Sequence, residues 1–145
     1  MQCKFPLIKL SGSPFARGKT YGTAAKAQVQ ISLNLYAKIF MAFANLSWEE
    51  ATAKTYDKEK TIETYLPEAV EEMRGIAEGA GVSYEDILAL NCRSELMFAL
   101  PDGCSVLALP PEAANGKTIL AQTWDWLIGS RPATVILEIH QEPLP

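Results

Sequence analysis

The chain has 145 residues, of which 48% are hydrophobic and 21% are charged. A chain of this size buries roughly 70% of its unfolded surface on folding, so one domain with an ordinary core is expected and extensive disorder is excluded. Seventeen acidic and thirteen basic residues give a formal net charge of −4. No basic stretch stands out, which argues against a nucleic-acid or anionic-membrane binder.

The N-terminal residues show no basic region followed by a long apolar run, so no secretory signal is expected. The longest apolar stretches, such as 39–44, are far shorter than the roughly 20 residues that a membrane span needs. Cys3, Cys92 and Cys104 are widely spaced and His140 is the single histidine, so neither a disulfide framework nor a zinc site is predicted. We expect a cytoplasmic protein without a metal or nucleotide cofactor.

Helical patterns fill the first two thirds of the chain. Ser13 and Pro14 predict the start of a long helical stretch that runs to about Leu46, in which apolar residues recur every four positions. Gly18 and Gly22 lie four residues apart on one face near its start. They lower helix propensity, and we interpret them as permitting a close approach to another backbone.

Three further helices are expected. A capping box that begins at Ser47 opens a helix that ends near Leu66. The next helix begins at the following proline and stops in the segment 78–81. Ser83 caps the last one, which runs to about Asn91.

Beyond these helices the pattern changes to short apolar runs. Residues 104–109 and 118–124 flank a turn signal, Asn115-Gly, and predict a β-hairpin. Residues 134–139 predict a third strand. N-terminal helices followed by antiparallel strands favour an α+β fold for a single domain that spans 1–145.

Cys104 is preceded by Asp102-Gly103 and stands at the start of the first predicted strand. If Cys104 Sγ attacks the Gly103 carbonyl, the amide becomes a thioester, and hydrolysis frees a new N-terminal cysteine. Its α-amine, with an unperturbed pKa of about 7.7–8.0, accepts the thiol proton near neutral pH. One residue then supplies both nucleophile and base. Taken alone, Gly-Cys is weak evidence, since a buried cysteine at the start of a core strand has the same sequence.

Five motifs accompany this cysteine. They read Gly-x-Pro-x-x-Arg-Gly-x-x-x-Gly, Arg-Gly-Ile-Ala-Glu-Gly-Ala-Gly, Asn-x-Arg-Ser-Glu, Asp-Gly-Cys-Ser and Gln-x-Trp-Asp, at residues 12–22, 74–81, 91–95, 102–105 and 122–125. In this order they resemble the acyl-coenzyme A:6-aminopenicillanic acid acyltransferase (isopenicillin N acyltransferase) or C45 peptidase family of N-terminal-nucleophile hydrolases. Thr123 replaces the asparagine that is usual in the last motif.

The resemblance implies a zymogen that cleaves itself between Gly103 and Cys104. Cys104 would then be the catalytic nucleophile, Asp125 would help to hold the nucleophile and its amine in place, and Gln122 would lie near the thiol. The residues implied to support processing are Arg93, Glu95 and Asp102.

The resemblance also implies an enzyme that acts on C–N amide bonds, as a hydrolase or an acyltransferase, through an acyl-Cys104 thioester. Its substrate would be a small-molecule amide or acyl thioester, and acyl-coenzyme A enters only as an acyl donor that the family suggests. The implied fold is an αββα sandwich, in which 1–103 is the α piece and 104–145 the start of the β piece. Family members continue further, so we expect an incomplete β piece and slow or no self-cleavage.

Other interpretations stay open. The chain can be a truncated, catalytically incomplete domain that acts only as a binding or assembly unit, or an unrelated α+β thiol protein. Arg93 and Glu95 can form a structural ion pair, and Asp125 can cap a turn. Arg17, beside the two glycines of the first motif, is expected to serve packing and loop anchoring. Cys92 is expected to be inert, as is Cys3.

Overall fold

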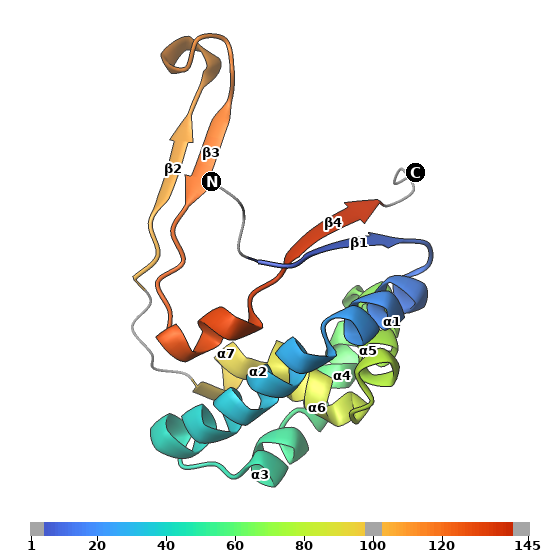
Figure 1. Ribbon diagram of the computed structural model, residues 1–145. Coiled ribbons are helices and arrows are strands. Elements are labelled where there is room, and N and C mark those ends of the chain that lie inside the picture. The colour runs from blue at the N-terminus through green and yellow to red at the C-terminus, as the bar shows by residue number, and fades with distance from the viewer. Residues whose placement is uncertain (1–4, 98–102, 141–145) are drawn as a thin grey trace. The chain divides into compact units, whose positions relative to one another are not determined.

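The computed structural model describes residues 5–97 and 103–140 (Figure 1). The chain divides into two compact units. We call Met1–Phe98 together with Gly129–Pro145 the helical unit, and Ala99–Ile128 the hairpin unit.

The helical unit contains most of the helices and one pair of strands. Its helices are α1 (Pro14–Ala24), α2 (Lys26–Ile39), the π-helical turn η1 (Phe40–Ala44), α3 (Trp48–Ala53), α4 (Tyr56–Tyr65), α5 (Pro67–Ala80), α6 (Tyr84–Asn91) and α7 (Arg93–Met97). Its strands are β1 (Leu7–Ser11) and β4 (Ile136–His140). The hairpin unit contains β2 (Val106–Leu109), the 3-10 turn η2 (Pro111–Ala113) and β3 (Ile119–Gln122), and the 3-10 segment η3 (Ile128–Ala133) follows it.

Helices α1 and α5 pack backbone against backbone. A Cβ placed at Gly18 of α1 would overlap the Glu72 carbonyl, and one placed at Gly75 of α5 would overlap the Phe15 carbonyl. Matching contacts one turn further along the same helices involve Gly22 and Gly79. The close approach predicted at the α1 glycines is confirmed. Its partner is the second glycine motif, because only residues without a Cβ let two helix backbones approach this closely.

Arg17 fixes the same helix pair by charge. Its side chain is only 7% exposed, and its Nη2 lies 2.9 Å from the Glu72 carboxylate of α5. Its Nη1 donates a hydrogen bond of 2.8 Å to the Gly12 carbonyl in the loop before α1. The interpretation of Arg17 as a packing and anchoring residue is confirmed.

The predicted helix starts are confirmed by their caps. The hydroxyls of Ser13, Ser47 and Ser83 each accept a hydrogen bond from the third backbone N–H that follows them. Each of the last two forms a complete capping box. Gly81, in the left-handed region with φ +70°, ends α5 within the predicted segment.

Two predicted helices are each broken in the structure. The stretch from Pro14 is interrupted at Ala25, which is fully buried against β1, and it ends in the π-helical turn. The stretch from Trp48 is interrupted near Thr55, a buried residue whose hydroxyl donates to the Thr52 carbonyl. Tertiary burial at each break overrides the local helical pattern. Helix α7 was not predicted.

Strand β1 was also not predicted, and its partner corrects the expected order of elements. It pairs in parallel with β4, with Leu7 opposite Ile136. Ile8 and Leu10 are buried on the side of α1, while Lys9 forms an ion pair with Glu138 on the other side. The predicted third strand therefore exists but pairs with β1. Expecting only antiparallel strands after the helices was wrong, because the partner of β4 comes from the opposite end of the sequence.

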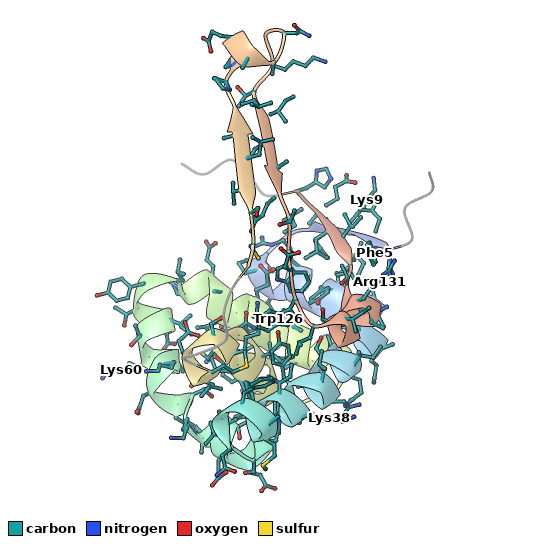
Figure 2. The ribbon with its side chains drawn as sticks, turned by 90° about the vertical axis from the view of Figure 1, so that its left-hand side faces the viewer. Phe5, Lys9, Lys38, Lys60, Trp126 and Arg131 are labelled. Atoms are coloured by element: carbon teal, nitrogen blue, oxygen red, sulfur yellow. The ribbon has the colours of Figure 1, made fainter. Side chains whose placement is uncertain are left out.

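Strands β2 and β3 form the predicted antiparallel hairpin, with Val106 opposite Gln122. Asn115 and Gly116 have positive φ angles of 52° and 78°, as the turn signal requires. Leu120 is 74% exposed, and apolar side chains project along both strands (Figure 2). The fold class is α+β as predicted, whereas the αββα sandwich stays a prediction.

Candidate active site

Gly103 and Cys104 lie in the extended segment directly before β2. Cys104 is a half-buried thiol. Gly103 is exposed, and no atom lies within 4 Å of the position that its Cβ would take. Among the described residues, a side chain at position 103 would therefore meet no neighbour. Asp102, predicted to support processing, lies outside the described residues.

Thr123 joins the segment of the predicted nucleophile to the predicted acid. The Ser105 N–H donates a hydrogen bond of 3.0 Å to Thr123 Oγ1, and the Thr123 N–H donates one of 2.9 Å to the Ser105 carbonyl. The Thr123 hydroxyl in turn donates to Asp125 Oδ2 at 3.4 Å. The hairpin thus connects the residue next to Cys104 to Asp125 through one hydroxyl group.

The sequence marked Thr123 only as a departure from the family motif. Two signals identify its role: the hairpin register sets position 105 opposite 123, and a hydroxyl both accepts and donates a hydrogen bond. An asparagine at this position likewise has both kinds of group. Thr123 is therefore the member of this hydrogen-bond network that motif reading alone missed.

Gln122, the other predicted support, is the last residue of β3. It stands directly opposite Val106, two residues after Cys104. Asp125 follows three residues later in the irregular segment after β3. The structure therefore places both residues in the same unit as Cys104, and their catalytic roles stay predictions.

Arg93 and Glu95 both belong to α7 in the helical unit. Arg93 Nη1 donates a hydrogen bond of 3.0 Å to the Leu90 carbonyl, and its guanidinium group lies over the Tyr36 ring at 5.9 Å. The ion pairs of the described residues do not include one between Arg93 and Glu95. The ion-pair interpretation was wrong: the backbone and an aromatic ring hold the guanidinium, and Glu95 lines a cavity instead.

Residues 5–97 and 103–140 contain no group of three or more His, Cys, Asp or Glu side chains arranged to hold a metal ion. Within the same residues, no helix combines the length and the apolar character that a membrane crossing requires.

Comparison with known proteins gives a distant relationship. The sequence matches no protein-family model. It is 26% identical over 141 residues to the acyl-coenzyme A:6-aminopenicillanic-acid-acyltransferase 40 kDa form of Emericella nidulans. The match covers 95% of this chain and 39% of that protein, so the chain spans about two fifths of its relative's length.

Proposed function

We propose that this chain carries the nucleophile of a self-processing cysteine amide hydrolase or acyltransferase. The observation that carries the proposal is the similarity to an acyltransferase over 95% of the chain, which includes Cys104. The hydrogen bonds that link Ser105, Thr123 and Asp125 support it, because they brace the strand segment next to that cysteine.

Processing begins when Cys104 Sγ attacks the Gly103 carbonyl carbon. The Gly103–Cys104 C–N bond breaks, a C–S bond forms, and the nitrogen takes up the thiol proton and leaves as the α-amine of Cys104. Water then hydrolyses the thioester, which releases the Gly103 carboxylate and restores the thiol.

The processed chain then uses the same thiol on an external substrate. The α-amine accepts the thiol proton and the thiolate attacks an amide or thioester carbonyl. The amine or thiol of the substrate leaves, and the acyl group stays on Cys104. Water as acceptor gives hydrolysis and an amine acceptor gives acyl transfer, with small-molecule amides and acyl thioesters, acyl-coenzyme A among them, as the substrate class.

Asp125 is proposed to act through Thr123 rather than alone. Its carboxylate accepts a hydrogen bond from the Thr123 hydroxyl, which orients the lone pairs of that oxygen toward the Ser105 N–H. Thr123→Val keeps the shape of the side chain but removes both hydrogen bonds. We expect it to slow cleavage about thirtyfold while it leaves the helical unit unchanged, since each of the two hydrogen bonds contributes about 1 kcal/mol.

Intact-mass spectrometry of the expressed chain tests the proposal. At neutral pH we expect slow appearance of fragments 1–103 and 104–145, accelerated by hydroxylamine, which intercepts a thioester. Cys104→Ala should remain whole under the same conditions, and Cys92→Ala, the matched control in the helical unit, should cleave as the parent does. Cleavage between residues 103 and 104 that persists in Cys104→Ala would overturn the proposal.

The exposed hairpin favours a second candidate, a non-catalytic binding or assembly unit. An isolated two-stranded hairpin is marginal in water, yet β2 and β3 display large apolar side chains such as Leu120 and Val106. In that case the uncleaved chain self-associates, Leu120→Lys weakens the association, and Cys104→Ala has no effect on it. Sedimentation velocity on these two variants separates the candidates.

A further inference from the structure

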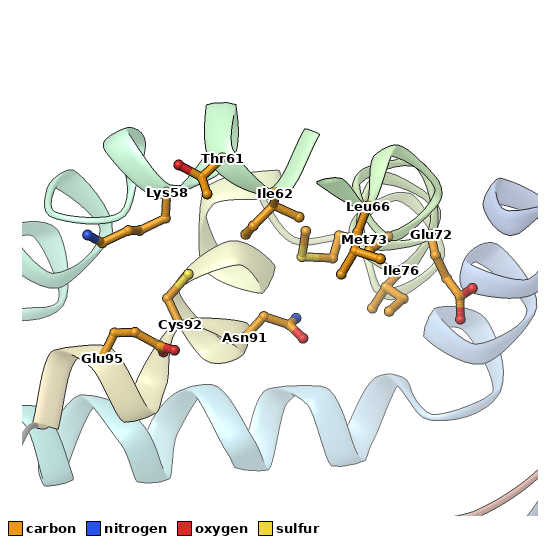
Figure 3. Close-up of a pocket in the computed structure, with 11 residues that line it drawn as sticks. Lys58, Thr61, Ile62, Leu66, Glu72, Met73, Ile76, Asn91, Cys92 and Glu95 are labelled. Carbon is orange, nitrogen blue, oxygen red and sulfur yellow. The ribbon is translucent and has the colours of Figure 1, made fainter. Parts of the chain in front are cut away.

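A cavity of about 610 Å³ lies within the helical unit, between α4, α5 and the α6–α7 segment (Figure 3). Neither the motifs around Cys104 nor the proposed chemistry uses it. The described residues that line it fall between Lys58 and Glu95, within the helical unit. A volume of this size is typical of sites for small molecules.

One side of the cavity is apolar. Ile62 and Leu66 line it at α4 and its C-terminal end, and Met73 and Ile76 line it from α5. Figure 3 shows the Met73 thioether between Ile62 on one side and Leu66 and Ile76 on the other. Such a wall accommodates a hydrocarbon or aromatic body, since each buried methylene contributes about 0.8 kcal/mol.

The opposite side is polar. The Asn91 amide donates one of its two N–H groups to the Ile87 carbonyl at 2.9 Å, and its second N–H and its Oδ1 remain for a ligand. In Figure 3 the Glu95 carboxylate points toward Asn91, whereas the Lys58 ammonium points away from the cavity centre. Glu72, also at the edge, is already bound to Arg17. The acceptor charge turned into the cavity is therefore that of Glu95.

The geometry points to a binding site for a small amphipathic amine. Its apolar body lies against Ile62, Met73 and Ile76, and its protonated amino group donates to the Glu95 carboxylate and to Asn91 Oδ1. The Glu95 carboxylate would repel a carboxylate ligand, because both are negatively charged. An alcohol could not form the ion pair with Glu95, so the site selects amines.

Cys92, on the same side of the cavity, fits non-covalent binding. Burial, and next the Glu95 carboxylate, raise the pKa of its thiol, while Lys58 lowers it by a smaller amount. The thiol therefore stays protonated at neutral pH and is a poor nucleophile. It forms part of the wall of the cavity rather than a reactive group.

Isothermal titration calorimetry with n-hexylamine and n-octylamine tests the site. We expect 1:1 binding that tightens about fourfold for each added methylene, with 1-octanol and octanoate at least tenfold weaker than octylamine. Glu95→Gln, a change at an exposed residue, should weaken octylamine about tenfold. The matched control Lys58→Gln, which also removes one rim charge, should not weaken it.

Filling the cavity gives a second, independent measurement. Ala69 lines it on α5, so Ala69→Leu should abolish amine binding, whereas Ala113→Leu in the hairpin unit should leave it intact. Circular dichroism confirms that each variant is folded. Equal affinity for amine, alcohol and carboxylate, or octylamine binding unchanged in Glu95→Gln, would overturn the proposal. Cys104→Ala should bind octylamine as the parent does, so this test stands apart from that of the proposed chemistry.

Discussion

The helical unit buries large apolar side chains in its core, whereas the hairpin unit leaves large apolar side chains of its strands exposed to solvent. Leu88 of α6 is 2% exposed within a core shared by α2, α5 and α6, whereas Leu120 of β3 is 74% exposed. In the helical unit the backbones of α1 and α5 are in direct contact. In the hairpin unit no described atom lies within 4 Å of the position that a Cβ on Gly103 or Gly116 would take. The residues predicted to do chemistry are in the sparsely packed unit. The packed core that stabilises the fold and the residues proposed for chemistry therefore lie in different parts of this chain.

The difference in packing between the two units is tested most directly by adding one methyl group to a glycine in each unit. Gly75→Ala should lower the free energy of unfolding by about 3 kcal/mol, because the new Cβ overlaps the Phe15 carbonyl and two helix backbones must separate. The loss comes in spite of the higher helix propensity of alanine. Urea unfolding followed by circular dichroism measures it.

Gly103→Ala is the matched control for that change. Its Cβ meets nothing within 4 Å, so the free energy of unfolding should change by less than about 0.5 kcal/mol. A loss below about 1 kcal/mol for Gly75→Ala would contradict the close packing of α1 on α5.

Truncating one leucine in each unit sharpens the contrast in burial. Leu88→Ala should cost about 2–3 kcal/mol, since it removes buried methyl groups and leaves a cavity in the core. Leu120→Ala should cost less than about 0.5 kcal/mol, because that side chain is already in water. Similar losses of unfolding free energy for the two variants would mean that the hairpin is packed in solution.

A third test compares a buried with an exposed ion pair inside the helical unit. Glu72→Gln leaves the buried Arg17 guanidinium without its anion and should cost about 2 kcal/mol. Glu78→Gln removes a pair with Lys19 in which both side chains are 54% exposed, and should cost less than about 1 kcal/mol. Adding salt should weaken the second pair and leave the first almost unchanged, which thermal unfolding in low and high salt can show.

The smallest expected effect is pH dependence at the α3 capping box. The Ser47 N–H, and next the Ser47 hydroxyl, lower the pKa of the Glu50 carboxyl below its ordinary 4.5. Because the folded pKa is the lower one, the ionised carboxylate stabilises the fold above pH 4.5, and this contribution is lost as pH falls through the folded value.

Glu50→Gln should therefore flatten the change of the unfolding midpoint between about pH 3 and pH 6. A parent and a Glu50→Gln variant with the same pH profile would rule out the cap as its source. The effect is confined to α3 and should not alter the hairpin unit.

Local signals in the sequence sufficed for much of the fold. Ser47 and Ser83 marked helix starts because a capping side chain bonds within three residues, and Asn115-Gly116 marked the hairpin turn because it needs positive φ angles. Strand β1 escaped prediction because five residues carry too little periodicity, and its pairing is set by β4, more than a hundred residues away. In the candidate site, Cys104 and Asp125 were proposed from motifs, whereas the bridging role of Thr123 required the hairpin register.

The sequence by itself determined the helix caps, the hairpin, the need for a close backbone approach at Gly18, and the choice of Cys104 as candidate nucleophile. Each of these depends on neighbours within a few residues or on a short motif. Only the tertiary structure decided which backbone meets Gly18, where the long helices break, which strand pairs with β4, and that Glu95 faces a cavity rather than Arg93. Those outcomes depend on contacts between distant segments, where burial and steric fit outweigh local preference.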